Sequence, residues 1–245
     1  MEVQHGLKCL YSAYKKRFKL VLDGIFTNFS TVIEKPFNDW TPYFQTDTYF
    51  TCISEHKNEE DTYGRLSMWR AYGEASGVAF VLNNGDFLNP SDPIDGIFSY
   101  PVDYLNDQGV EERLNTIADN ISANLDFIRQ QGPDIIANWV FQTLRVMALC
   151  TKHPGFSEEK EWRIIFSPRL DKSTRVTKAI RNVKGGLQPV YTVPLRNIPT
   201  LINRIIIGPT QYPWAAQEAF IDLLTMVGVI DAAKKVFVSD IPLRR

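Results

Sequence analysis

The sequence has few of the residues that stabilise a fold through disulfide bonds or bound metal ions. It contains three cysteines and three histidines, with no Cys-x-x-Cys pair and no His-Glu-x-x-His spacing. Neither a disulfide framework nor a zinc site is therefore predicted. The cysteines stand far apart in apolar settings, which predicts reduced, buried thiols: these are Cys9, Cys52 and Cys150.

Other absences remove several function classes. The chain has no Gly-rich phosphate loop, no Gly-x-Ser-x-Gly nucleophile elbow, and no apolar run long enough to span a bilayer. The N-terminus lacks the apolar core of a secretory signal. Lysines and arginines (27) nearly balance aspartates and glutamates (28), so the composition does not indicate a nucleic-acid or membrane partner. We expect a soluble, cytoplasmic protein.

The N-terminal part reads as helical. Apolar residues between Leu7 and Ile33 recur at helical spacing, which predicts an amphipathic helix or a bent pair. Four basic residues occupy the polar face and are expected to be solvated: Lys15, Lys16, Arg17 and Lys19. Pro36 and Pro42 are predicted to bracket a loop.

The remainder alternates strand-like and helix-like segments. The run 77–82 is apolar throughout, which favours a central strand covered on both faces. The basic segment 170–187 is predicted to be a mobile loop. The fold class is therefore α+β, a single mixed or antiparallel sheet domain with an N-terminal helix and a helical insertion. The expected boundaries are 1–45 for the helical segment and 46–245 for the core domain, with the insertion at about 108–150.

Charged residues gather around one predicted turn. Pro154-Gly155 should release the chain into a strand, on which alternate residues share a face. Glu159, Glu161 and Arg163 would then line one side of that strand, with Lys152 and His153 across the turn. Such a cluster must be solvated, paired or used in chemistry. The plainer alternative is a ladder of salt bridges on an exposed strand face.

The order of these segments resembles a bacterial family known only as domain of unknown function 2971. The resemblance rests on four segments, of which the first and third are the most specific: 52–54 with 68–73 and 77–80, then 100–104, then 152–163, then 205–209. The family label implies no activity.

A weaker resemblance does imply one. A strand ending in Ser54, an aromatic-bearing helix, and a later Glu-x-Glu strand are similar to the layout of ADP-ribosyltransferases. That resemblance implies Glu161 as the catalytic glutamate, Glu159 as the first acid of the pair, and Ser54 as a residue that helps to hold NAD. The arginine or histidine on an early strand in that superfamily has no counterpart here.

The remaining candidates come from their chemistry. Trp69 or Tyr72 could stack on nicotinamide or adenine, although core packing explains them equally well. Lys152 or Arg163 could neutralise a pyrophosphate. His153 is a candidate in the same site, or else an ordinary loop residue.

These residues lead to two readings. The first is a bacterial toxin or defence effector that uses NAD as a substrate, acting as an ADP-ribosyltransferase or NAD glycohydrolase without a metal. It would have a protein or nucleic-acid acceptor and a neutralising antitoxin. The second is a non-catalytic ligand-sensing or protein-interaction module. A nuclease pattern, Pro133-Asp134 with Glu158-x-Lys160, is weaker, because Asp134 is better placed to start a helix.

Overall fold

The described residues form two compact units. The computed structural model describes residues 2–73, 76–83, 98–183, 185–193 and 197–242. Unit 1 comprises Met1–Ile53 and Gly96–Lys172, and unit 2 comprises Ser54–Asp95 and Ser173–Arg245. Helices and strands are mixed in the chain, and the strands form several small sheets with parallel and antiparallel pairs. The α+β fold class is confirmed.

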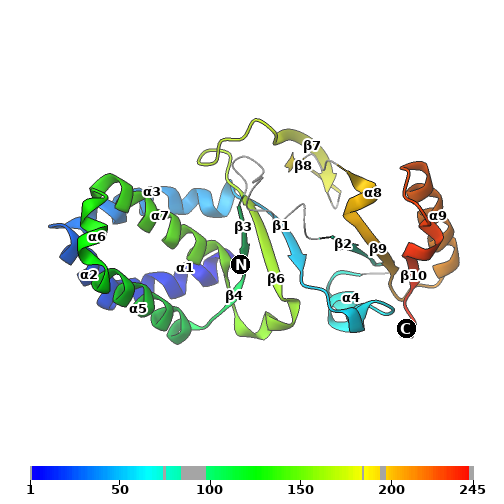
Figure 1. Cartoon of the computed structure of the whole chain (residues 1–245), viewed down its shortest axis with the longest axis horizontal. Helices are drawn as coiled ribbons and strands as arrows, with labels where there is room; N and C mark the ends of the chain where they lie inside the picture. Colours follow the sequence, from blue (N-terminus) through cyan, green and yellow to red (C-terminus); the bar gives the residue numbers. More distant parts are fainter. Residues whose placement is uncertain (1, 74–75, 84–97, 184, 194–196, 243–245) are drawn as a thin grey trace. The chain divides into compact units, whose positions relative to one another are not determined.

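Helices make up most of unit 1 (Figure 1). Their apolar faces meet in one core, where Phe18, Leu22 and Leu149 are almost completely buried. The predicted N-terminal helical segment and the predicted helical insertion therefore pack together. The elements are α1 (Glu2–Ala13), η1 (Tyr14–Phe18), α2 (Lys19–Ile25), α3 (Phe29–Thr46), α5 (Asp107–Ala123), α6 (Leu125–Gln130) and α7 (Pro133–Cys150).

The predicted loop between Pro36 and Pro42 is wrong, because both prolines lie inside α3. Each proline lacks the N–H that would bond to the preceding turn. Both are exposed, so water can reach the carbonyl groups that this leaves unbonded. The opposite face of α3 buries Ile33, Phe37 and Phe44 in the core. Burial of this face outweighs the low helix propensity of proline.

The main sheet of unit 1 has β6 at its centre. The order is β1 (Tyr49–Ser54), β6 (Glu161–Phe166) and β3 (Phe98–Pro101). β3 pairs antiparallel with β6 and places Tyr100 opposite Arg163. Pro101 ends β3 on the outer strand, where a missing N–H is tolerated. Beside this sheet, β4 (Asp103–Tyr104) pairs parallel with β5 (Thr151–Lys152), directly after α7.

Unit 2 is built around β9 (Ile202–Ile207). This strand pairs parallel with β10 (Val236–Val238) and antiparallel with β2 (Val78–Leu82), and α9 (Pro213–Met226) packs against β9 and β10. The central position predicted for β2 is wrong: β2 is an outer strand among those described, and Phe80 is 53% exposed. The shorter elements are η2 (Asn58–Glu60), α4 (Leu66–Tyr72), α8 (Ile198–Leu201) and η5 (Ala232–Lys235).

The basic segment predicted as a loop is largely a β-hairpin. β7 (Thr177–Val183) pairs antiparallel with β8 (Gly186–Thr192). Gly185 supplies a φ of +83°, a conformation that glycine adopts without steric cost; Lys184 lies outside the described residues. The Thr177 and Thr192 hydroxyls also bond across the strands at 2.8 Å. Basic side chains are compatible with this hairpin because most of its residues are exposed.

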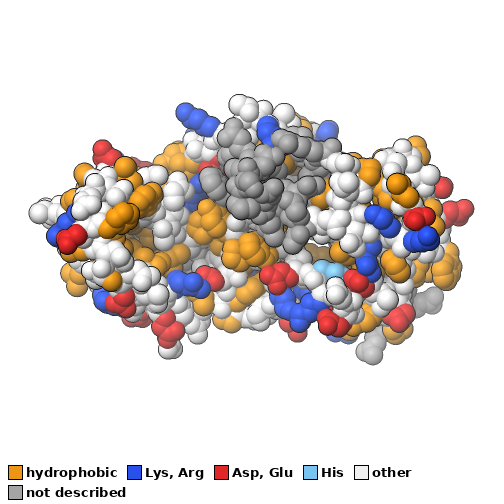
Figure 2. Space-filling view, viewed as in Figure 1, with side chains coloured by type: hydrophobic (Ala, Val, Ile, Leu, Met, Phe, Trp, Pro, Cys, Tyr) orange, Lys and Arg blue, Asp and Glu red, His pale blue; other side chains and the backbone are white. Residues whose placement is uncertain are grey.

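Two of the three cysteines behave as predicted. Cys9 and Cys150 are buried, and burial raises the pKa of each thiol to about 12, so neither is a thiolate at neutral pH. The prediction was wrong for Cys52, which is exposed on β1. Among the described residues, no helix combines the length and the apolar character needed to cross a membrane. Figure 2 shows acidic and basic side chains beside one another on the visible surface.

A buried ion pair joins α7 to the segment that follows β6. The Arg145 guanidinium donates to both carboxylate oxygens of Asp171, at 2.9 and 2.6 Å, and to the Ser167 hydroxyl at 3.0 Å. Both charged side chains are 5% exposed. Removal of one partner would leave an uncompensated charge in a region that water cannot reach.

We therefore expect Arg145→Met to lower the free energy of unfolding by about 3–5 kcal/mol. Arg113→Met is the control, because the Arg113–Asp103 pair is about half exposed and should contribute less than about 1 kcal/mol. Urea titrations followed by circular dichroism measure both. Equal losses in the two variants would contradict the assigned role of Arg145.

Candidate functional site

The structure brings four of the predicted site residues together in unit 1. We call Lys152, Glu159, Glu161 and Arg163 the ion cluster. Lys152 ends β5, Glu159 ends the 3₁₀-helix η4 (Pro154–Glu159), and the other two lie on β6. The expectation that Glu159 shares the strand face is wrong, because Lys160 turns the chain with a φ of +44° before β6 begins.

Lys152 contacts both glutamates, which this turn separates. Its Nζ lies 2.5 Å from Glu159 Oε2 and 3.1 Å from Glu161 Oε2, while Arg163 Nε lies 2.6 Å from Glu161 Oε1. The Lys152, Glu161 and Arg163 side chains are only 3–5% exposed, and Glu159 is 14% exposed. Two positive and two negative charges balance, so the cluster is stable without a bound counter-ion.

Neighbouring groups complete the cluster. Arg163 Nη1 donates to the Leu149 carbonyl oxygen at 2.5 Å, and the guanidinium lies 5.4 Å from the centre of the Phe50 ring. The Phe156 ring covers the Lys152 ammonium at 4.7 Å. The Tyr104 hydroxyl accepts the Glu161 backbone N–H at 2.7 Å. The cluster therefore links the end of α7 with β1, β4 and η4.

Glu161 is held as a carboxylate. Burial alone would raise its pKa, but hydrogen bonds from Arg163, Cys52 and Lys152 outweigh burial and lower the pKa of Glu161 to about 2. A group with this pKa does not donate a proton at neutral pH. At neutral pH it is a negative charge that two cations already oppose at close range.

His153 has a local role beside the cluster. It is the N-terminal cap of η4, and its Nδ1 accepts the Gly155 backbone N–H at 3.1 Å. Its exposed ring stands edge-on to His5, with the ring centres 5.5 Å apart. A cap of this kind explains the residue without a catalytic function.

The other three predicted residues belong to unit 2. Trp69 donates its indole N–H to the Tyr63 carbonyl oxygen at 2.8 Å. Its ring packs so closely on glycines that a methyl group added at Gly208 would meet the ring at 2.7 Å. This contact supports the core-packing alternative for Trp69. Tyr72 is 63% exposed at the end of α4, and Ser54 ends β1.

The residues considered for a metal do not form a site. Within the described ranges, no group of three His, Cys, Asp or Glu side chains is placed to hold a metal ion. Pro133 and Asp134 start α7, as predicted, and Glu158 lies in η4. They therefore do not occupy the adjacent strands that the nuclease pattern requires.

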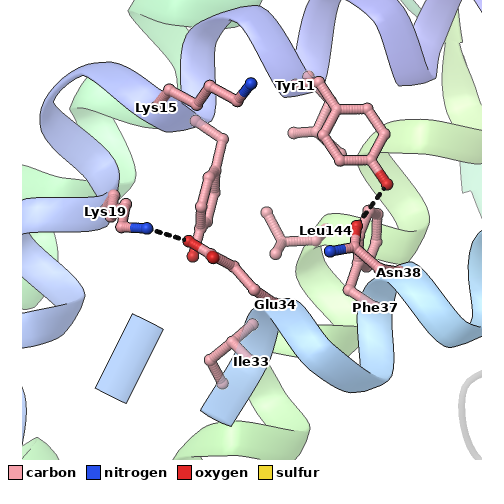
Figure 3. Close-up of a pocket in the computed structure, with 10 residues that line it drawn as sticks. Tyr11, Lys15, Lys19, Ile33, Glu34, Phe37, Asn38 and Leu144 are labelled. Carbon is pink, nitrogen blue, oxygen red and sulfur yellow. Dashed lines mark hydrogen bonds and ion pairs between the residues drawn. The ribbon is translucent and has the colours of Figure 1, made fainter. Parts of the chain in front are cut away.

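A cavity lies between the unit 1 helices (Figure 3), and no pattern in the sequence indicated it directly. We call it the helical cavity; its volume is about 330 Å³. Its walls come from α1, η1, α2, α3 and α7, and the lining residues are Leu10, Tyr11, Tyr14, Lys15, Lys19, Ile33, Glu34, Phe37, Asn38 and Leu144.

A kink between α1 and α2 shapes one wall of this cavity. The kinked segment η1 holds Tyr14 and Lys15, and Lys16 within it departs from helical geometry with a ψ of −107°. The Tyr14 hydroxyl is buried and makes no hydrogen bond of normal geometry among the described residues. Burial, followed by the charge of the Glu34 carboxylate and a hydrogen-bonding interaction with it, raises the pKa of Tyr14.

Residues 68–164 match the model of a family described as a protein of unknown function (DUF2971). The predicted resemblance is confirmed over this segment. The match begins in α4, one residue before Trp69, and ends on β6, one residue after Arg163. It includes most of the two most specific segments. No curated protein and no solved structure matches the chain.

The lowered pKa of Glu161 predicts how stability depends on pH. A carboxyl group with a lower pKa in the folded state stabilises the protein above its ordinary pKa and loses that contribution as the pH falls. We expect Glu161→Gln to be less stable than the wild type near pH 7. The difference should shrink as the pH falls from about 4.5 to about 2.

Urea titrations across this pH range measure the effect, and Glu112→Gln is the control because Glu112 is exposed on α5. If the free energy of unfolding of Glu161→Gln stays below that of the wild type by a constant amount down to pH 2, the ionised carboxylate does not contribute to stability.

Proposed function

We propose that this chain is a ligand-sensing module that binds a small molecule in the helical cavity of unit 1. The observation that carries the proposal is the cavity itself, a space of about 330 Å³ enclosed largely by apolar side chains, with the Tyr14 hydroxyl and a few charged groups in its wall.

The size and composition of the cavity support the proposal. Ligand pockets commonly enclose roughly 300–1,000 Å³ and combine apolar walls with a few polar groups. Here Leu10, Ile33, Phe37 and Leu144 supply apolar surface, and all four are buried. In Figure 3 Lys15, Glu34 and Asn38 lie around the same space. The ion cluster differs, because its charges already satisfy one another.

The substitution Leu144→Phe tests this function by filling the cavity. The larger side chain should occupy the free space and lower stability by no more than about 1–3 kcal/mol. It should weaken the binding of an apolar fluorescent probe, such as anilinonaphthalene sulfonate, by tenfold or more (roughly 1.4 kcal/mol). Fluorescence titration of the native protein measures the affinity.

Ile135→Phe is the matched control, because Ile135 lies on the same helix but is 47% exposed. It should leave probe binding unchanged. Equal binding by the wild type and Leu144→Phe would remove the helical cavity as the ligand site.

A second candidate is the NAD-using transferase or glycohydrolase. One observation favours it: Glu161 remains ionised beside Glu159, which is the most accessible member of the ion cluster. A fixed carboxylate can stabilise the positive charge that develops on the ribose as the nicotinamide bond breaks. In this reading Lys152 and Arg163 pair with pyrophosphate, and a protein or nucleic acid accepts the ADP-ribose.

A measurement of NAD consumption tests this second function. If it is correct, the wild type consumes NAD in the presence of a cell lysate, and Glu161→Gln is slower by about 100-fold or more. Glu158→Gln, an exposed neighbour on η4, should retain the wild-type rate. Mass spectrometry follows nicotinamide release and ADP-ribose adducts. Unchanged NAD with every acceptor would contradict an enzymatic function.

A further inference from the structure

We infer that the ligand of the helical cavity is a small amphipathic anion with an apolar body and a single carboxylate. The inference rests on the proposed function and names its ligand. It follows from three observations: the apolar floor, the net charge of the lining, and the protonated phenol of Tyr14.

The floor of the cavity selects an apolar body. Phe37 and Leu144 are 4% and 2% exposed, and both line the cavity (Figure 3). A ligand group placed against them contacts apolar surface. Burial of apolar ligand surface stabilises the complex by roughly 25 cal/mol for each Å².

The charges of the lining select an anion. Three of the four basic residues from Lys15 to Lys19 have acidic partners: Lys16 pairs with Glu111, Arg17 with Asp119, and Lys19 with Glu34 at 2.7 Å. Lys15 makes no ion pair within the part of the chain that the structure describes. With Lys15, Lys19 and Glu34 in the lining, two positive charges against one negative leave a net charge of +1.

This arrangement also disfavours other ligands. A cation would meet two lysines and find only one carboxylate, which is already bound to Lys19. A doubly charged phosphate would carry more negative charge than the net +1 of the lining balances. A monocarboxylate matches the single positive charge of Lys15.

Tyr14 supplies a hydrogen-bond donor close to the same cation. Because burial and Glu34 raise its pKa, the phenol stays protonated at neutral pH and can donate its hydrogen. A ligand carboxylate held by Lys15 would gain a charge-assisted bond, and Tyr14 could donate to it in exchange for its interaction with Glu34. Both residues belong to η1, so the ligand would contact this kinked segment directly.

Calorimetry at low salt with the full chain tests the inference. Two acids of different body shape, decanoate and phenylpropionate, are compared with their neutral alcohols, decanol and phenylpropanol, and with decylamine. At least one acid should bind more tightly than its alcohol by about tenfold or more, which is near the lower bound for a hydrogen bond to a charged group. Whether the chain or the ring is preferred identifies the body of the ligand.

Lys15→Gln should abolish this preference, so that acid and alcohol bind alike. Lys8→Gln removes an equal charge from an exposed position on α1 outside the lining, and it should preserve the preference. A loss of the same size in both variants would mean that general electrostatic attraction, and not Lys15, selects the acid.

The outcomes separate the inference from the proposed function. Equal binding of acid and alcohol by the wild type would overturn the anionic ligand and leave a neutral ligand in the cavity. Tighter binding of decylamine would overturn it in the same way. If no compound binds the wild type, or if Leu144→Phe leaves acid binding unchanged, both the inference and the cavity function fail.

Discussion

The buried pair of Glu161 and Arg163 is the interaction on which unit 1 most depends. Both residues lie on β6, the central strand of the main sheet, and neither charge can reach water. Two ionised groups at this depth are tolerated only if each finds a partner. Lys152 from β5 and the Leu149 carbonyl at the end of α7 meet this requirement. The chain must therefore bring these segments together before the strand can be buried.

The ion cluster and the helical cavity show two ways of handling polar groups inside a protein. In the cluster, charges are balanced and hydrogen bonds are short, so little binding capacity remains for a further molecule. In the cavity, Lys15 and the Tyr14 hydroxyl lie beside free space and apolar surface. A dense group of charged residues in a sequence can thus serve the fold, while the vacant binding capacity lies where the sequence shows ordinary helix.

The elements that were predicted correctly are those whose local sequence alone indicates their type. The helix start at Pro133-Asp134 and the strand ending in Ser54 were both predicted, and both are present as the start of α7 and the end of β1. Prediction was poorer where tertiary packing decides, as at Pro36, where burial of the opposite helix face keeps α3 intact. The spacing of the ion-cluster residues predicted that they lie close together. It did not predict that they are buried, because their burial depends on β1 and β3, which lie on either side of β6. The periodicity of apolar residues could not predict the helical cavity, because the residues that line it come from five separate elements.

The path of the backbone between the two units has a consequence for the evolution of this chain. The polypeptide passes from one unit to the other three times, at Ile53, Asp95 and Lys172. Neither unit is a continuous stretch, so a single gene fusion or a single deletion could not add or remove one of them whole. The segment that matches the family model begins in one unit and ends in the other. A protein that inherits this segment therefore inherits part of unit 1 and part of unit 2.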